Sequence, residues 1–521
     1  MKIYSHSSIG YEGELIEIEI DLKKGTSGID IVGLAGNEIK ESRERVKSAI
    51  KNSNFHFPKD RILINLAPAG IKKLGTAFDL SIAISIIKIQ ENKNNKNLEV
   101  LILGELQLDG KIRSIKAVLP AIALAKEKEI KFAIVPFENL EEACLIDGLN
   151  IWGVKDLKET IKIVEQLNDN ILPPRTNIKA QKTIKQDCIL DYDFKNIKGQ
   201  QRAKRAIEIA IAGGHNIMLF GPPGSGKTLS IKCAQSILPP LTNKELIETN
   251  RIWSISGKLI DRKIIKQRPF RNPHHTASKE GIIGGGPNPL PGEVSLAHNG
   301  ILFLDEALEF KKSILQSLRE PIEDKSISIS RASSKLFKYP ANFQLMLAMN
   351  LCPCGNLGKK NIDCFCSQQE ISNYWKKLGA AMLDRIDIRV PTRAINNEKL
   401  LGETSESSSE IKQRIIKARN IQNIRYENFA NINKNSDLNS DHIEKFCELS
   451  AILKNDLIYI LNKLNISSRA THSILKIART ISDLKEEKNI SREALLEAIE
   501  HRKTEKICLK IKPLKYLGSL N

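Results

Sequence analysis

Long apolar runs are missing from this sequence. No stretch of 18 or more apolar residues occurs, and the best candidate, residues 77–87, is short and contains Asp79. A membrane-spanning helix needs about 20 such residues, so no membrane segment is predicted. Charged and polar residues follow Met1-Lys2-Ile3-Tyr4, so a secretory leader is not expected. We therefore expect a soluble, cytoplasmic protein with no membrane partner.

A disulfide framework is not expected either. The chain of 521 residues has 9 cysteines, an odd number, and this favours free thiols or metal ligation.

Basic residues outnumber acidic residues. Lysine and arginine total 80 against 61 acidic residues, a net charge of +19. Such an excess favours an acidic polymer, most commonly nucleic acid, as partner. Because basic residues are spread along the whole chain, a generally lysine-rich composition is the alternative explanation.

A glycine-rich octapeptide gives the clearest functional signal. It follows the apolar run 216–220 and precedes a helix-like segment, the strand–loop–helix order of a P-loop. Backbone N–H groups of such a loop face the α- and β-phosphates of a nucleotide. Lys227 would reach the β- and γ-phosphates, and the Thr228 hydroxyl would hold Mg²⁺. The predicted nucleotide-binding residues are Gly221, Pro222, Pro223, Gly224, Ser225, Gly226, Lys227 and Thr228.

A second apolar strand ends in two carboxylates, Asp305 and Glu306, the pattern of a Walker B motif. Asp305 would share the Mg²⁺ of Thr228 and so belongs to the nucleotide site, and Glu306 would polarise the attacking water. The next apolar strand, 342–349, presents Asn350 at its end, where a polar residue can contact the γ-phosphate. The sequence therefore predicts hydrolysis of ATP with Mg²⁺ as cofactor, with Glu306 and Asn350 as catalytic residues.

Alternating segments at 326–331 and 335–339 predict a β-hairpin between these two strands. A hairpin at this place can project into the pore of a ring, where basic side chains would meet a phosphate backbone. An ordinary surface hairpin explains the pattern equally well. The candidate DNA-contacting residues are Arg331, Lys335 and Lys338.

Four of the cysteines form two close pairs, Cys352-Pro-Cys354 and Cys364-Phe-Cys366. Four thiolates in two pairs suit a tetrahedral Zn²⁺. One residue separates the members of each pair, whereas common zinc sites have two to four. We expect a structural zinc site, with reduced thiols or a redox switch as the alternative.

The last part of the chain predicts a small helical unit. Ser407 and Glu410 form a capping-box pattern that would open a helix reaching to about Arg425. Residues 440–502 read as three or four further helices, with Ser467 or Ser468 and Ser491 as N-caps.

Two arginines are candidate catalytic residues. Arg385 stands between carboxylates in Leu383-Asp-Arg-Ile-Asp387. In ring ATPases such an arginine reaches the neighbour's nucleotide and neutralises charge on the γ-phosphate. Arg469 begins a helix of the small helical unit and would sense the nucleotide from there. A surface ion pair and a solvated helix residue are the respective alternatives.

The order of P-loop, Asp-Glu strand, asparagine, single arginine and helical lid resembles an AAA+ ATPase. One family, the YifB/ComM magnesium-chelatase-like ATPases, is similar over residues 1 to about 503, with matching segments at 268–278, 284–286, 295–300, 349–355 and 383–387. Leu351 stands where that family usually has proline.

The segments 41–47, 65–69 and 73–80 resemble the amino-terminal domain of this family, which has the fold of the Lon protease domain. A Lon-type protease needs a serine activated by a lysine. This chain offers Thr76 and Ala77 near the serine position and Leu119 at the lysine position. We expect a binding or assembly module without the catalytic dyad.

The resemblance implies an α/β fold class, with a P-loop AAA+ core and helical lid behind a Lon-protease-like α/β domain. The expected segments are the Lon-like domain 1–165, a linker 166–190, the ATPase core 191–395 with the cysteine insert, the lid 396–503 and a basic tail 504–521.

The resemblance also implies a homo-hexamer and, for ComM-like members, ATP-driven DNA branch migration during natural transformation. Single-stranded or branched DNA would then be the partner. The alternative is a chelatase-like or protein-remodelling motor. A chelatase would also need metal-binding partner subunits, whose acidic-linker signature is absent from this sequence.

Overall fold

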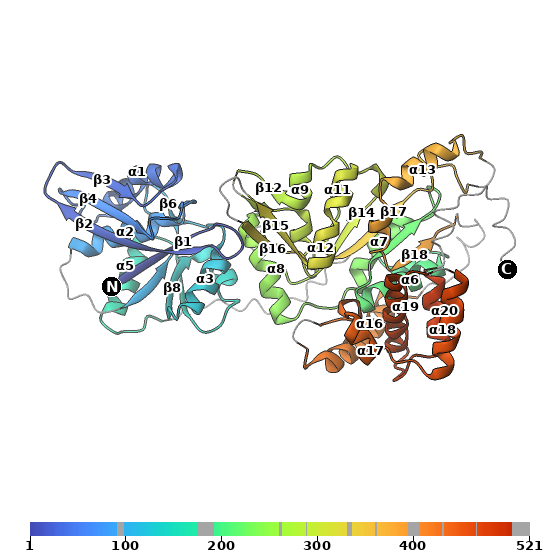
Figure 1. The fold of residues 1–521 in the computed structure, drawn as a ribbon. Coiled ribbons are helices and arrows are strands. Elements are labelled where there is room, and N and C mark those ends of the chain that lie inside the picture. Colours follow the sequence, from blue (N-terminus) through green and yellow to red (C-terminus); the bar gives the residue numbers. More distant parts are fainter. Residues whose placement is uncertain are drawn as a thin grey trace.

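The computed structural model describes most of the chain, namely residues 1–90, 98–174, 192–259, 263–287, 289–330, 336–359, 362–393, 406–429, 432–464 and 466–502. Figure 1 shows two α/β units side by side, with a helical unit in orange and red packed beneath the second. No helix in these ranges is both long and apolar enough to cross a membrane.

The first unit is built on a seven-stranded mixed sheet of order β3-β4-β2-β1-β5-β8-β9. The strands are β1 (Lys2–Ser7), β2 (Glu14–Lys23), β3 (Gly28–Val32), β4 (Arg61–Ala67), β5 (Glu99–Ile102), β8 (Phe132–Pro136) and β9 (Asn150–Val154). The helices are α1 (Asn37–Asn52), α2 (Phe78–Gln90), α3 (Val118–Glu127), α4 (Leu140–Ala143) and α5 (Leu157–Asn168), and a short ribbon joins β6 (Glu105–Leu106) to β7 (Ile112–Arg113).

Alternating side chains of this sheet fill two cores. Val100 and Ile102 pack with the apolar faces of α1, α2 and α5, whereas Leu101 and Leu103 pack with α3 and α4. This follows from the period of two along a strand, which sends successive side chains to opposite faces. The result is a sheet covered by helices on both sides.

The second unit contains a five-stranded sheet of order β11-β14-β17-β10-β18 in which every pair is parallel. Its strands are β10 (Ile217–Phe220), β11 (Phe270–Arg271), β14 (Ile301–Leu304), β17 (Gln344–Met349) and β18 (Ile388–Pro391). Its helices are α6 (Gln201–Gly213), α7 (Lys227–Cys233), α8 (Asn243–Ser256), α9 (Lys279–Ile283), α10 (Glu293–Leu296), α11 (Lys312–Ser317), α12 (Arg319–Asp324), α13 (Gln368–Lys376) and α14 (Ala380–Leu383). Two antiparallel ribbons complete it, β12 (Gly284–Gly285) with β13 (Leu290–Pro291) and β15 (Ser326–Ser330) with β16 (Leu336–Pro340).

The helical unit comprises α16 (Ser408–Tyr426), α17 (Ser440–Phe446), α18 (Ala451–Leu464), α19 (Ser468–Leu484) and α20 (Arg492–Glu500). Ser407 and Glu410 form the expected capping box, and Ser467 and Ser491 cap α19 and α20. The apolar faces of α16 and α19 share one hydrophobic cluster with α6. The helical unit is therefore continuous with the core of the second unit.

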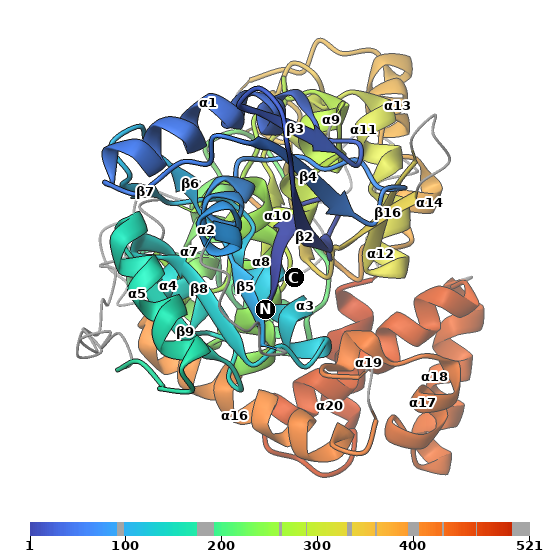
Figure 2. The ribbon, with the colours of Figure 1, turned by 90° about the vertical axis from the view of Figure 1, so that its left-hand side faces the viewer.

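The two α/β units touch along the β15–β16 hairpin, where Phe337 and Tyr339 share an apolar cluster with Tyr11 and Ala117, and at α8, which Figure 1 shows on the side of the second unit that faces the first. The backbone N–H of Ala117 donates to the carbonyl oxygen of Ser254 (3.2 Å), and the guanidinium of Arg251 lies 4.4 Å above the ring of Tyr11. Turned by 90°, Figure 2 shows the first unit in front of the second, with the helical unit to one side.

Candidate functional site

Three neighbouring parallel strands end side by side at the candidate site. Strands β14, β17 and β10 are adjacent in the sheet, and the chain leaves their carboxyl ends at Asp305, Asn350 and Gly221. Ligands of open α/β sheets bind outside this edge. The sheet order thus gathers three motifs that lie far apart in the sequence.

The loop after β10 wraps around the amino group of Lys227. The Lys227 Nζ donates hydrogen bonds to the carbonyl oxygens of Gly221 (2.9 Å) and Pro222 (2.8 Å). It also lies 3.3 Å from Oδ1 of Asn350, the residue at the end of the neighbouring strand β17. The lysine and the asparagine that were predicted to meet one phosphate are therefore in contact with each other.

The glycines of this loop leave room for a ligand. Gly224 and Gly226 have φ values of +76° and +79°, a conformation that residues with a side chain rarely adopt. Apart from the neighbouring residues along the chain, a Cβ placed on either one would have no atom of the described residues within 4 Å. The loop is a concave run of backbone around open space, the shape of an anion-binding nest.

Two side chains from other elements hold the loop in this shape. The hydroxyls of Ser225 and Thr392 are 2.8 Å apart. The Nε2 of Gln200, just before α6, donates to the carbonyl oxygens of Ser225 (2.9 Å) and Arg393 (2.7 Å). Sequence reasoning missed Gln200 and Thr392. The one local signal is Gly199 before Gln200, a turn directly ahead of a helix.

The acidic strand end lies against the P-loop. Thr228 Oγ1 donates to Asp305 Oδ1 (3.1 Å), so the two predicted Mg²⁺ ligands are adjacent. Glu306 is exposed and has φ +50°, and its backbone N–H donates to Asp305 Oδ1 (3.0 Å). A non-glycine residue in the left-handed region is uncommon and is typical of strained functional positions.

These residues fit ATP with Mg²⁺. The open nest and Lys227 offer donors to phosphate oxygens, while Thr228 and Asp305 offer the oxygen ligands that Mg²⁺ prefers. A bound Mg²⁺ would neutralise phosphate charge. Glu306 and Asn350 border the place where the terminal phosphate would lie, and a carboxylate there can accept a proton from water.

Burial lowers the pKa of Lys227 to about 8, although the nearby carboxylates of Asp305 and Glu306 act in the opposite direction. Desolvation disfavours the charged ammonium, and a phosphate would restore it. The site is therefore poised to take up an anion.

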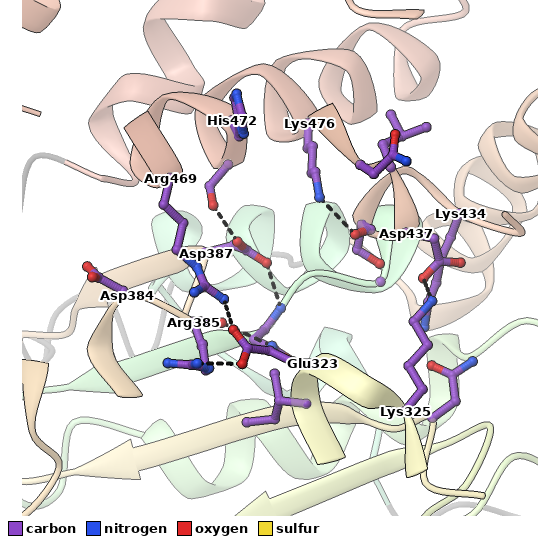
Figure 3. Close-up of a pocket in the computed structure, with 18 of the residues that line it drawn as sticks. Glu323, Lys325, Asp384, Arg385, Asp387, Lys434, Asp437, Arg469, His472 and Lys476 are labelled. Atoms are coloured by element: carbon purple, nitrogen blue, oxygen red, sulfur yellow. Dashed lines mark hydrogen bonds and ion pairs between the residues drawn. The ribbon is translucent and has the colours of Figure 1, made fainter. Parts of the chain in front are cut away.

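The two predicted catalytic arginines lie at a different place. Arg385 and Arg469 line a cavity of about 320 Å³ between the core and the helical unit, and both point toward Glu323 of α12 (Figure 3). Nη2 of Arg385 lies 2.5 Å and Nη2 of Arg469 2.8 Å from its carboxylate oxygens. Partial burial alone would raise the pKa of Glu323, but the hydrogen bonds from both arginines lower it below its usual range. Sequence reasoning missed this glutamate, since nothing local marks it.

The cavity opens at the amino-terminal edge of the core sheet. Asn216 directly precedes β10, and its side-chain amide donates to the carbonyl oxygen of Arg385 (3.1 Å). Its backbone N–H faces Asp387 Oδ2 at 3.4 Å. The P-loop begins at the opposite, carboxyl end of β10. The structure therefore does not bring Arg385 and Arg469 together with it.

The remaining candidates are the basic residues of the hairpin and the four clustered cysteines. Lys338 is exposed on β16, whereas Arg331 and Lys335 lie outside the described residues. The four clustered cysteines do converge: their sulfur atoms all lie within 4.8 Å of one another.

Comparison with known proteins gives the family. Models of magnesium chelatase match three segments: subunit ChlI over residues 193–400, the ChlI subunit of Mg-chelatase over 18–139, and the ChlI C-terminal region over 405–502. A shorter similarity, 25% identity over 164 residues, links 29% of this chain to 21% of the Lon protease of Buchnera aphidicola.

Two relatives are similar over nearly their whole length. The competence protein ComM of Haemophilus influenzae is 39% identical over 504 residues, covering 96% of this chain and 97% of ComM. The protein YifB of Escherichia coli is 37% identical over 519 residues, covering 98% and 99% of the two chains. The chain therefore belongs to the YifB/ComM family of magnesium-chelatase-like AAA+ ATPases, a membership that implies ATPase activity with ATP and Mg²⁺.

Proposed function

We propose that this protein assembles as a homo-hexameric ring whose ATP sites are completed between neighbouring subunits, and that the ring uses ATP hydrolysis to move along DNA. The observation that carries the proposal is the position of Arg385 and Arg469. Both lie beside the start of β10, and the P-loop follows its end.

The length of β10 decides whether these arginines can contact the nucleotide of their own subunit or that of a neighbour. Four residues of β-strand span roughly 13 Å, at about 3.3 Å per residue, and the sheet with its helices stands between the two ends of β10. An arginine at the amino-terminal edge cannot meet a phosphate at the carboxyl edge of the same subunit. In a ring, however, one subunit presents this edge to the P-loop of the next, as arginine fingers require.

The Glu323 carboxylate fits a switchable role for this pair. It holds both arginines in one chain. The side chains of Glu323 (41% exposed) and Arg469 (47%) are open to a neighbour, whereas Arg385 (8%) must leave Glu323 to meet a neighbour's nucleotide. A triphosphate offers more negative charge than one carboxylate and would draw both guanidinium groups away. Glu323 would thus hold both arginines until a neighbouring subunit with bound ATP attracts them.

Charge, the hairpin and the relatives support DNA as the substrate. The net charge is +19, and the β15–β16 hairpin presents Lys338 to solvent. A relative covering nearly the whole chain is named a competence protein. On these grounds we assign the motor to branch migration on single-stranded or branched DNA, in recombination or natural transformation.

The first unit then serves as a binding or assembly module rather than a protease. Ala77, one of the two residues near the serine position, and Leu119, at the expected position of the base, are both buried in one hydrophobic cluster. Leu119 has no group that could take a proton from Thr76, the other residue near the serine position, so no activated nucleophile is expected.

The test is ATP hydrolysis with and without DNA. We expect forked, four-way or single-stranded DNA to raise the rate above that with plain duplex, and DNA binding at low salt to weaken as salt is added. Glu306→Gln should lower turnover by about 10²–10⁴-fold, whereas the exposed neighbour variant Glu309→Gln should not. If no DNA binds or stimulates hydrolysis, the DNA assignment is wrong and a protein-remodelling or chelatase-like motor takes its place.

A further inference from the structure

The four clustered cysteines form a compact group of sulfur atoms beside the nucleotide site. The distances between sulfur atoms are 3.4 Å for Cys352 and Cys354, 3.6 Å for Cys354 and Cys364, and 3.6 Å for Cys352 and Cys364. Cys366 lies within 4.8 Å of all three. The cysteines are free thiols, since no disulfide joins any of them in the described chain.

These distances fit one ion and not a cluster of several. Four thiolates around a single Zn²⁺, with Zn–S bonds of about 2.3 Å, place the sulfur atoms roughly 3.8 Å apart at the corners of a tetrahedron. A polynuclear iron–sulfur cluster would hold its thiolates farther apart, because iron and sulfide atoms lie between them. The sulfur atoms are also too far apart for the 2.05 Å bond of a disulfide.

The backbone around Cys352 supports ligation. The N–H of Leu357 donates to Cys352 Sγ (3.3 Å), and the N–H of Gly355 donates to the Cys352 carbonyl oxygen (3.1 Å). Hydrogen bonds from backbone N–H groups stabilise negative charge on sulfur. Gly355 has φ +72°, which closes the turn between the first cysteine pair and the rest of the loop.

This turn rests on the P-loop. A Cβ on Gly355 would lie 3.0 Å from Cγ of Pro223, and one on Gly358 would lie 3.8 Å from Cδ of Pro222. The indole N–H of Trp375 donates to the carbonyl oxygen of Leu351 (3.0 Å), just before this segment. Asn350, which contacts Lys227, directly precedes it. The cysteine loop therefore touches the two P-loop prolines that precede the phosphate nest.

We propose that Cys352, Cys354, Cys364 and Cys366 hold one structural Zn²⁺, and that the metal fixes residues 352–358 as a support under the P-loop prolines. The metal site stands on the sulfur geometry alone, whereas the effect on nucleotide binding rests on the proposed ATPase function.

Metal analysis tests the first part on the full-length protein purified under reducing conditions. We expect one zinc per chain, released when a mercurial blocks the thiols, and less than half an equivalent in Cys354→Ser with Cys364→Ser. Cys144→Ser, an exposed cysteine in the first unit, should keep the full equivalent. Wild-type protein with no zinc and freely reactive thiols, or with iron in its place, overturns the proposal. This measurement on wild-type protein stands even if the double variant fails to fold.

A glycine variant tests the second part without removing a ligand. Gly355→Ala should retain zinc but bind a fluorescent ATP analogue roughly tenfold more weakly, since the added methyl presses on Pro223. Gly148→Ala, which also changes a glycine with positive φ (+107°) but lies in an exposed turn of the first unit, should bind normally. If Gly355→Ala binds as tightly as wild type while zinc is present, the supporting role is wrong and the metal site survives. If wild-type protein binds no nucleotide, the ATPase proposal fails and zinc content is unaffected.

Discussion

Lys227 links nucleotide binding to pH. Its pKa is lowered to about 8 by burial, so in the free protein the ammonium is largely protonated at pH 7 and largely neutral at pH 9. A bound triphosphate favours the charged form and raises this pKa. Binding above pH 8 must therefore take up a proton, and affinity must fall as the pH rises through 8.

We expect the affinity for ATP to be nearly constant between pH 6.5 and 7.5 and to fall by up to about tenfold per pH unit above 8. Calorimetry in buffers of different ionisation enthalpy would measure the proton uptake, which should be small at pH 7 and approach one at pH 9. Lys227→Arg carries a charge that does not titrate in this range, so any residual binding should be flat with pH. An affinity for wild type that does not change between pH 7 and 9 would contradict the prediction.

Among the elements, the helical unit is held together by a buried charge network around Asp483 of α19. Arg425 donates to both carboxylate oxygens (3.0 and 2.5 Å), Arg479 Nε donates to Oδ1 (3.1 Å) and Asn435 Nδ2 donates to Oδ2 (2.9 Å). The Asp483 side chain has no exposed surface. Removing it would leave two guanidinium groups without their carboxylate in a buried place.

We expect Asp483→Ala to destabilise the helical unit by roughly 3–5 kcal/mol, the usual effect of breaking a buried charge pair. Thermal unfolding followed by circular dichroism should show a lower midpoint for the helical signal. The matched control is Asp456→Ala, which removes an exposed partner of Arg492 and should change stability by about 0–1 kcal/mol. Equal midpoints for the two variants would show that the network contributes little.

The β15–β16 hairpin carries a prediction about DNA. Lys338 is exposed on β16, while the following Tyr339 is buried and donates to the carbonyl oxygen of Pro289 (2.6 Å). Tyr339 therefore holds this strand in place, and Lys338 faces solvent. Lys338→Ala should weaken DNA binding equally for all sequences and reduce the slope of log affinity against log salt by about 1. Lys51→Ala, on the distant helix α1, should leave the slope unchanged.

Local patterns in the sequence were enough to predict much of this architecture. The P-loop, the capping box of Ser407 with Glu410 and the N-cap Ser491 depend on residues a few positions apart, and each is present in the structure. Contacts between distant segments could not be predicted in this way. Gln200 donates a hydrogen bond to Ser225 of the P-loop, and Glu323 joins two arginines from different units, because packing and not spacing brings these residues together.

The whole molecule separates the two halves of its proposed catalytic site. The P-loop, Asp305 and Glu306 lie at the carboxyl edge of the core sheet, and Arg385 lies at the amino edge. If each nucleotide is completed by a neighbour, then two defective proteins can repair one another. Lys227→Ala loses its own phosphate site but still supplies Arg385, whereas Arg385→Ala keeps its phosphate site and lacks only the donated arginine.

Each variant alone should hydrolyse ATP roughly 10³-fold more slowly than wild type or worse, as for a lost arginine finger. Mixed at equal amounts before assembly, random rings would contain complete sites at roughly a quarter of their interfaces, and hydrolysis should recover in proportion. A mixture of Lys227→Ala with the double variant Lys227→Ala, Arg385→Ala should recover nothing, because no subunit then has a phosphate site. An arginine that served its own subunit would leave both mixtures inactive, since no chain in either one carries both groups.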